Sequence, residues 1–299
     1  MIEAAVVGRV AIDLYPNQLR TPLRDVRTYT RYVGGFAGNV ATGLARLGVR
    51  TAIVSRVGDD GHGEFVRGFL ESEGVDTRFL AVDPAWLTPP TFAELWPPDR
   101  FPLTFYRRPT APDWQIRRDD VDAAELAGVP VMFATGTGLA QSPSRETTLH
   151  LLREHEQTTI FDLDWRPALW ERTEEYLGLA QDAAGVSDIV LGNTDEVAAA
   201  GGIDALLELA PTLIVKRGDD GAVLYADGDV VEVPGIPVEV VNGLGAGDAF
   251  AAALGYAIVR DLGLREGVRL GNVAGAFVAQ RVPCSEAMPT LDELSTVSV

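Results

Sequence analysis

Short apolar runs alternate with longer amphipathic stretches along most of this chain, and this alternation limits the folds that the chain can adopt. Seven apolar runs predict strands, at 4–7, 50–54, 129–134, 159–163, 189–191, 213–216 and 222–225. Eight amphipathic stretches predict helices, at 39–47, 63–73, 144–154, 176–183, 194–200, 204–210, 247–259 and 264–279. Apolar strands that alternate with helices are typical of a mostly parallel sheet covered on both faces, so the sequence predicts an α/β fold.

Two segments rich in polar, aromatic and proline residues interrupt this alternation. Segment 13–33 is polar, with threonine and tyrosine alternating near its end, and segment 88–116 carries many prolines and aromatic side chains. Neither pattern is typical of a helix, so both segments are expected to form strands of a small extra sheet over the edge of the main one. A simpler alternative is that their aromatic side chains only pack against the main body. With no internal repeat or interdomain linker, residues 1–299 are expected to form a single domain.

Charge and composition disfavour several classes of function. The 299 residues carry a formal charge of −18, which argues against a nucleic-acid partner because phosphate contacts need clustered lysine and arginine. No apolar run is as long as a membrane span and no secretory leader is recognisable, so a cytoplasmic protein with no membrane partner is expected. Cys284 is the only cysteine, so an internal disulfide is excluded. Lys216 is the only lysine, so nearly all positive charge is carried by arginine.

The stretch from Val240 to Phe250 carries the strongest chemical signal. It reads Val-Val-Asn-Gly-Leu-Gly-Ala-Gly-Asp-Ala-Phe, a β-branched run followed by a turn of small residues and a predicted helix. The backbone N–H groups of the 244–247 turn, chiefly of Gly245, Ala246 and Gly247, are expected to gather at the helix N-terminus, where free donors and the helix dipole favour an anion. A carboxylate beside such a site fits a general base, so Asp248 is predicted to take a proton during phosphoryl transfer.

Two other interpretations of this turn need weighing. Its glycines resemble a dinucleotide fingerprint, which would indicate an NAD-dependent oxidoreductase, but the third glycine of G-x-G-x-x-G would fall at Asp248. The turn could also be a tight strand-to-helix connection with a capping aspartate. No G-x-x-x-x-G-K-[ST] motif occurs, which excludes a P-loop enzyme.

The same stretch resembles the second signature of the ribokinase-like (PfkB) family of sugar and nucleoside kinases. Most members have Asp-Thr before x-Gly-Ala-Gly-Asp, whereas this chain has Asn242-Gly243. A motif with asparagine at this position and Leu-Gly-Ala-Gly-Asp after it resembles that of one branch of the family, the 5-dehydro-2-deoxygluconokinases of myo-inositol breakdown. The departure from the usual aspartate also raises the hypothesis of a non-catalytic sugar- or nucleotide-binding protein with the same fold.

Other segments extend the resemblance from about residue 4 to 294. Tyr32-Val-Gly-Gly35, with Asn39-Val-Ala and a glycine-bounded stretch at 43–48, is similar to the family's first signature. Gly8-Arg9, Asp13-Leu-Tyr15 and the segments 97–107 and 284–290 resemble the branch. The resemblance implies a ribokinase-like three-layer α/β/α fold with a mostly parallel central sheet. It also implies a small β-sheet lid over the sugar, formed by about 13–33 and 88–116.

The resemblance also implies which residues face the sugar. Asp13, Gly34, Gly35 and Asn39 are expected to bind sugar hydroxyls, although a turn followed by a helix cap would explain the last three as well. Arg107 and Arg166 occupy places similar to arginines that bind a sugar-acid carboxylate in 2-keto-3-deoxygluconate kinases. Arginine suits bidentate carboxylate binding, but ordinary surface salt bridges are the alternative for each.

The nucleotide side is implied in the same way. Asn193-Thr-Asp-Glu196 resembles an Asn-x-x-Glu element that acts near the phosphates, with Glu196 meeting Mg²⁺ through water; a helix capping box is the alternative. The turn carrying Lys216, Gly218 and Gly221 resembles a nucleotide-binding turn. Two residues on one face of a late helix, Asn272 and Ala276, are expected near adenine, unless they serve only helix packing.

Together these features predict an ATP-dependent sugar kinase that uses Mg²⁺ and transfers the γ-phosphate to a hydroxyl of a ketodeoxy sugar acid. The first candidate acceptor is 5-dehydro-2-deoxygluconate. A 2-keto-3-deoxygluconate kinase or another sugar kinase of the family is the alternative. A monovalent cation is a further candidate cofactor, and a homodimer is the expected assembly if lid strands pair between subunits.

Overall fold

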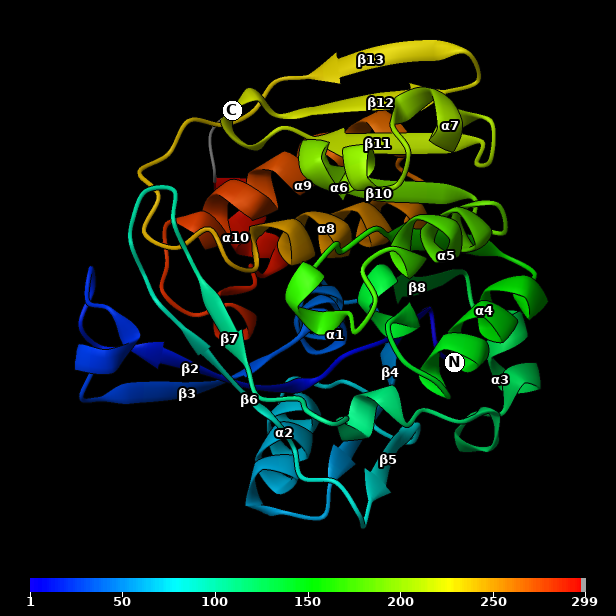
Figure 1. The fold of residues 1–299 in the computed structure, drawn as a ribbon. Coiled ribbons are helices and arrows are strands. Elements are labelled where there is room, and N and C mark those ends of the chain that lie inside the picture. The colour runs from blue at the N-terminus through cyan, green and yellow to red at the C-terminus, as the bar shows by residue number, and fades with distance from the viewer. Residues whose placement is uncertain (297–299) are drawn as a thin grey trace.

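The computed structural model describes residues 1–296, and a nine-stranded sheet runs through its centre (Figure 1). The strands are β1 (Ala4–Val7), β4 (Thr51–Gly58), β5 (Leu80–Asp83), β8 (Val131–Thr135), β9 (Thr158–Asp162), β10 (Ile189–Asn193), β11 (Thr212–Lys216), β12 (Ala222–Ala226) and β13 (Asp229–Val233). Their order is β13-β12-β11-β10-β9-β8-β1-β4-β5. All neighbours are parallel except β11–β12 and β12–β13, which confirms the mostly parallel sheet.

Both faces of the central sheet are buried, which explains the continuous apolar strands. Ile160 and Ile214 pack into the core on one face, while their neighbours Phe161 and Leu213 pack into the core on the other. The first face is covered by α1 (Phe36–Arg46), α2 (Gly61–Ser72), α8 (Ala246–Val259) and α9 (Leu264–Ala279). The second is covered by α3 (Ala123–Ala127), α4 (Ser144–Glu154), α5 (Glu175–Ala184), α6 (Thr194–Ala199) and α7 (Ile203–Leu207). The predicted three layers are therefore confirmed.

Helix α8 lies at the centre of the first layer and is apolar on nearly every side. It packs between α1, α9 and the sheet. Glycines in α1 and α9 allow these helices to approach α8 closely. A Cβ at Gly43 of α1 would lie 2.7 Å from Ala252 of α8, and one at Gly271 of α9 would lie 2.7 Å from the Phe250 ring. The tight packing fixes the position of the α8 N-terminus, where the predicted anion site lies.

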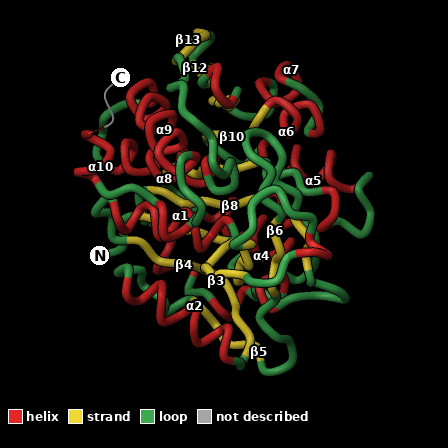
Figure 2. Tube along the Cα trace, turned by 90° about the vertical axis from the view of Figure 1, so that its left-hand side faces the viewer, coloured by secondary structure: helices red, strands yellow, loops and turns green. Residues whose placement is uncertain are grey.

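A second, four-stranded sheet projects from the main body (Figure 1), and Figure 2 views the molecule from the side on which this sheet projects. Its strands are β2 (Ala11–Pro16), β3 (Tyr29–Gly34), β6 (Pro90–Ala93) and β7 (Leu103–Phe105), in the order β3-β2-β6-β7. Strand β2 pairs antiparallel with β3 and parallel with β6, so segments about 75 residues apart in sequence form one sheet. We call this sheet the lid; it is the small sheet that the two irregular segments predicted.

Several elements differ from the sequence-based expectations. Strands β5 and β13 were not predicted: Val82 in the middle of β5 is 46% exposed, and β13 is largely exposed at the sheet edge, so neither has a continuous buried apolar pattern. The short helices α3 and α10 (Leu291–Thr296) were also missed. Helix α1 begins at Phe36, three residues before its predicted start, because Gly35 with φ 86° forms the N-cap. Within residues 1–296, no helix is long and apolar enough to cross a membrane.

Candidate active site

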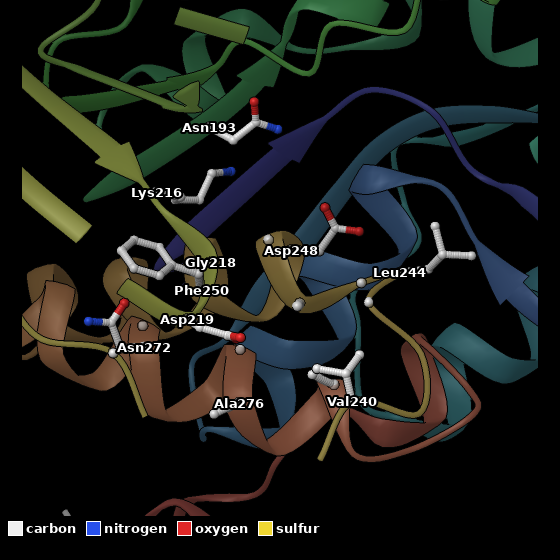
Figure 3. Close-up of a pocket in the computed structure, with 18 of the residues that line it drawn as sticks. Asn193, Lys216, Gly218, Asp219, Val240, Leu244, Asp248, Phe250, Asn272 and Ala276 are labelled. Carbon is white, nitrogen blue, oxygen red and sulfur yellow. The ribbon is translucent and has the colours of Figure 1, made fainter. Parts of the chain in front are cut away.

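A pocket of about 410 Å³ opens at the carboxyl edge of the central sheet (Figure 3). Three consecutive strands each contribute their last residue to its lining: Asp162 from β9, Asn193 from β10 and Lys216 from β11. The N-terminus of α8 and one face of α9 complete the wall. Open parallel sheets bind ligands at this edge, so the fold places the predicted residues where a ligand would be expected.

The turn before α8 leaves backbone donors free. Gly245 is the N-cap, with a left-handed φ of 83°, and no side chain caps the helix. The N–H groups of Gly245, Ala246 and Gly247 make no hydrogen bond to any described residue, so they are available to an anion. The N–H of Leu244 differs, because it donates to Asn242 Oδ1 at 3.0 Å. The available donors are therefore those of 245–247 rather than the full 244–247 run.

Asp248 lies in the first turn of α8 and points into the pocket (Figure 3). Asn39 Nδ2 donates to its Oδ2 at 2.7 Å. Burial raises the pKa of Asp248 to about 6, against the lowering effects of Asn39, Lys216 and Arg166. A carboxylate with a pKa just below neutrality is both ionised at pH 7 and able to accept a proton.

Asn242, the residue that departs from the usual family pattern, has a structural part to play. Its side chain is fully buried, and Nδ2 donates to the Val282 carbonyl at 2.7 Å while Oδ1 accepts from Leu244 N–H. An aspartate could accept from Leu244 but could not donate to Val282. The amide therefore shapes the turn that precedes the free donors.

The predicted sugar-side residues lie together at the base of the lid. A Cβ at Gly34 would lie 2.1 Å from the carboxyl carbon of Asp13, so only glycine allows that approach. Gly35 caps α1, and Asn39 lies in the first turn of that helix. Asn39 is 4% exposed, and its Oδ1 is buried without a partner among the described residues. Burial raises the pKa of Asp13 to about 6, opposed mainly by the charge of Arg9.

Both predicted carboxylate-binding arginines already have acidic partners. Arg107 is 2% exposed and outside the lining of the pocket; its two terminal nitrogens bind the two oxygens of Asp113, with Nη2 at 2.8 Å. Arg166 lines the pocket, with Nη1 2.9 Å from Glu196 and Nη2 3.2 Å from Asp164. The Arg107 pair is therefore buried, unlike the surface salt bridge considered as an alternative, while Arg166 keeps 41% of its side chain exposed.

The capping box predicted as one alternative for Asn193 and Glu196 is formed. Asn193 Oδ1 accepts from Glu196 N–H at 2.9 Å, and Glu196 Oε2 accepts from Asn193 N–H at 2.8 Å. The other oxygen of Glu196 accepts from Arg166. Among the residues that the structure describes, no group of three or more His, Cys, Asp or Glu side chains could hold a metal directly.

Lys216 reaches from β11 toward the start of α8. Its Nζ lies 2.9 Å from Asp162 Oδ2 and 3.3 Å from the place that a Cβ would take on Gly247. Burial raises the pKa of Asp162 to about 7, opposed chiefly by Lys216. Lys216, Asn193 and Asp248 surround one end of the pocket in Figure 3. This end thus combines one ammonium group with free backbone donors.

The other end of the pocket carries fewer charged side chains. Asn272 and Ala276 line it from one face of α9, and Asn272 Nδ2 donates to the carbonyls of Val233 and Pro234. Gly218 and Gly221 form the turn after β11, and both line the pocket. Gly221 has φ 86°, and a Cβ there would lie 2.2 Å from the Val233 carbonyl oxygen. Small residues thus leave room for a planar group.

Sequence reasoning did not indicate that Arg9 belongs to the site or that Asp164 binds it. Arg9 is 7% exposed, and it donates through Nε to Thr137 at 2.8 Å and through Nη2 to Asp164 at 3.0 Å. Asp164 adopts φ 35°, which non-glycine residues rarely take, and it binds both Arg9 and Arg166. The Gly8-Arg9 pair was visible as a resemblance to the branch, but nothing in the sequence indicates that its partner lies 155 residues away.

Comparisons with known proteins find relatives over nearly the whole chain. A profile of the family described as pfkB family carbohydrate kinase matches residues 1–291. The chain is 33% identical over 313 residues to a 5-dehydro-2-deoxygluconokinase from Shouchella clausii (strain KSM-K16), covering 99% of this chain and 95% of the relative.

Two solved structures share the fold across nearly their whole length. One is aminoimidazole riboside kinase from Salmonella enterica complexed with aminoimidazole riboside and an ATP analog, with 27% identity, a TM-score of 0.83 and 98% of each chain covered. The other is fructokinase from Vibrio cholerae O395 bound to fructose, ADP and calcium ion, with 25% identity, a TM-score of 0.87 and 98% of each chain covered. These likenesses confirm the ribokinase-like fold that the sequence predicted.

Proposed function

Because the chain belongs to the pfkB family of carbohydrate kinases and is an ATP-dependent sugar kinase, we propose that its acceptor is a ketodeoxy sugar acid, with 5-dehydro-2-deoxygluconate the first candidate. The full-length similarity to a 5-dehydro-2-deoxygluconokinase supports this acceptor. The observation that carries the chemistry is the juxtaposition of Asp248, held by Asn39, with the free N–H groups of Gly245 to Gly247.

Asp248 is the general base of the proposed reaction. It accepts the proton of the sugar hydroxyl as that oxygen forms a bond to the γ-phosphorus of ATP and the bond from phosphorus to the leaving ADP oxygen breaks. The N–H groups of 245–247 donate to the phosphoryl oxygens as charge develops. Asn39 holds the carboxylate through Nδ2, and its unpartnered Oδ1 is free to accept from a sugar hydroxyl.

The nucleotide is proposed to lie along the pocket from Asn193 and Lys216 to Asn272 and Ala276. Its adenine would occupy the end of the pocket near Gly218 and Gly221, and the Lys216 ammonium would bind the phosphates. Support comes from the two similar structures, which hold an ATP analog and ADP.

The residues near the phosphates fit a hydrated Mg²⁺ ion. Both oxygens of Glu196 are engaged by Asn193 and Arg166, so Glu196 would act through water. Such an ion supplies positive charge to the phosphate oxygens when bound. Residues Asn193 and Glu196 would orient its water shell.

Arg166 is the better placed of the two arginines to bind an acidic substrate group. It lines the pocket with an exposed guanidinium edge, whereas Arg107 would meet a carboxylate only through its unpartnered Nε or by releasing Asp113. In this proposal the acid group lies between the two arginines, on the side of the site that Asp13, Gly34 and Gly35 form.

A neutral-sugar kinase is the second candidate, favoured by the charges around the site. Arg107 and Arg166 are both paired with buried carboxylates, and Asp13 and Asp248 add acid groups nearby. These carboxylates offset the positive charge of the arginines, so the site attracts an anion less strongly than two unpaired arginines would.

The test is ADP release by the purified chain with Mg-ATP and a panel of acceptors: 5-dehydro-2-deoxygluconate, 2-keto-3-deoxygluconate, fructose, ribose and a nucleoside. The proposal expects the highest kcat/KM with 5-dehydro-2-deoxygluconate. A higher value with fructose would replace the acid acceptor by a neutral one. Arg166→Ala distinguishes the two further, because it should raise KM sharply for the acid and little for the neutral sugar.

A further inference from the structure

A small apolar cluster joins the lid to the turn that precedes α8. It contains Tyr15, Ala93, Leu95 and Cys284, and five partly buried residues pack against it, namely Tyr32, Phe101, Leu103, Leu244 and Val282. The lid strands and the connection between β6 and β7 supply six of the nine members, but Leu244 belongs to the turn, and Val282 and Cys284 belong to the loop after α9. The lid and the phosphate-side turn therefore share one packed contact.

Polar contacts inside this cluster run from the sugar side to Cys284. The Tyr15 hydroxyl lies 3.3 Å from Asp13 Oδ2 and 2.6 Å from Cys284 Sγ. Tyr15 is 1% exposed and Cys284 2%. Burial raises the pKa of both groups well above their usual values, so both stay protonated, and each can hydrogen-bond without carrying charge.

The loop at 282–285 then connects Cys284 to the phosphate side. A Cβ at Gly245 would lie 2.9 Å from Cys284 Sγ, so the cysteine packs directly against the N-cap of α8. The Val282 carbonyl accepts from Asn242, and Ser285 Oγ donates to the carbonyl of Val33 in the lid at 2.6 Å. One loop thus touches the lid, the sugar-side carboxylate through Tyr15, and the anion-binding turn.

We propose that Tyr15 and Cys284 are a pair of positioning residues that couples the sugar side at Asp13 to the phosphate side at Gly245. Through this pair, binding of the sugar restrains the turn at Gly245, and binding of the nucleotide restrains the lid at Asp13. The inference rests on the proposed function in one respect, since it takes Asp13 as the sugar-side carboxylate. It requires no particular sugar.

The first test is a double-mutant cycle read out as coupling between the two ligands. The affinity for the best acceptor of the panel is measured with and without the Mg complex of adenylyl imidodiphosphate, a non-hydrolysable ATP analogue. Tyr15→Phe and Cys284→Ala should each lower the ratio of the two affinities by about fivefold, the worth of one ordinary hydrogen bond. The double variant should lose no more than the larger single loss, because both changes break one link.

Tyr32→Phe is the matched control, because Tyr32 belongs to the same cluster and its ring centroid lies 5.5 Å from that of Tyr15 in a tilted arrangement. The Tyr32 hydroxyl makes no hydrogen bond to a described residue. This variant should leave the ratio unchanged, and Cys284→Ser should restore most of the loss seen with alanine. Unchanged coupling in both single variants, or additive losses in the double variant, would overturn the proposal.

Thiol labelling tests the same link in the native chain, so a variant that fails to fold does not end the test. Cys284 is the only cysteine, so its rate of reaction with Ellman's reagent reports one site. Both the Mg-nucleotide analogue alone and the acceptor alone should slow labelling several-fold. Protection by only one ligand would contradict the coupling. A change of acceptor in the ADP-release panel would alter the proposed function and leave this result standing.

Discussion

Asp248, the general base of the proposed reaction, is a carboxylic acid whose burial favours its protonated form. Its pKa of about 6 comes from burial, which Asn39, Lys216 and Arg166 offset only in part. A base with such a pKa loses activity when the pH falls below 6, because protonation removes its ability to accept the substrate proton.

We therefore expect Asp248→Asn to lower kcat by about 10²–10⁴-fold, the usual contribution of a positioned base. KM for Mg-ATP should change little, because the 245–247 donors do not depend on the Asp248 side chain. Steady-state kinetics across pH 5–8 check this, and kcat/KM of the native chain should rise through pH 6 and level off. A variant that keeps a tenth or more of the native kcat would remove Asp248 from the role of base.

Asn242 makes a second prediction at this scale. Asn242→Asp restores the usual family residue, yet it should lower the free energy of unfolding by about 2 kcal/mol, because a buried carboxylate would face the Val282 carbonyl without a donor. Urea denaturation measures this change. Asn272→Asp is the control, since Asn272 also donates to carbonyls but is less buried, and it should lose less. Equal losses would show that the burial of Asn242 is irrelevant.

Sequence reasoning predicted which residues line the pocket better than it predicted their partners. Gly245 to Asp248 are consecutive and all line the pocket, so a local pattern was enough to select the proposed anion site and base. The pairing of Arg107 with Asp113 occurs in an irregular segment that no periodicity describes. The contact between Arg9 and Asp164 depends on the ends of β1 and β9 lying at one sheet edge, which only the strand order reveals.

At the scale of elements, helix packing and helix propensity can be separated by two glycines. A Cβ at Gly255 of α8 would lie 2.5 Å from the Phe133 ring, whereas Gly178 of α5 has open space around it. Gly255→Ala should therefore destabilise the fold by about 1–3 kcal/mol through overpacking. Gly178→Ala should stabilise it by about 0.5–1 kcal/mol through helix propensity.

Thermal unfolding of the two alanine variants beside the native chain measures this pair. Opposite shifts of Tm are expected, and two shifts of the same sign would contradict the packing of α8 against β8. The outcome also bears on the site, because the same packing holds the α8 N-terminus in place.

Elements with a buried apolar face were predictable, whereas the two exposed edge strands and two short helices were not. All seven predicted strands and all eight predicted helices correspond to observed elements, since each is buried on a face that requires apolar residues. The order of the strands was outside the reach of these patterns, because periodicity says which face is buried and not which strand is the neighbour. Edge strands β5 and β13 lack the apolar pattern because one side of each faces solvent.

For the whole molecule, raised carboxyl pKa values set how stability varies with pH. Asp13 and Asp248 have pKa values of about 6 and Asp162 about 7, against 3.8 as the ordinary value. Between pH 5.5 and 7 the folded chain therefore holds protons that the unfolded chain has lost, so stability falls as pH rises through this range. Carboxyl groups with a lowered pKa, such as Asp164, act in the opposite direction only nearer their ordinary pKa of 3.8. The lowered pKa of His155 acts in the opposite direction below pH 6.5, but it is a single group.

We expect the free energy of unfolding to be at least about 1 kcal/mol lower at pH 7.5 than at pH 5.5. Urea denaturation at several pH values measures this slope, and Asp248→Asn should flatten it and raise Tm at pH 7.5. A stability that rises from pH 5.5 to 7.5 would mean that these carboxyl groups are better solvated than their burial indicates.

The place of Lys216 has a practical consequence. Every other cationic side chain at neutral pH is arginine, so lysine-directed reagents have one side-chain target in the whole sequence. That target lies inside the pocket, 2.9 Å from Asp162. Amine coupling to a solid support, biotinylation and fluorescent tagging usually modify lysines on the surface. Here these reagents would be directed at Lys216, beside the turn that we propose binds the phosphates. No other lysine side chain competes with Lys216 for such a reagent.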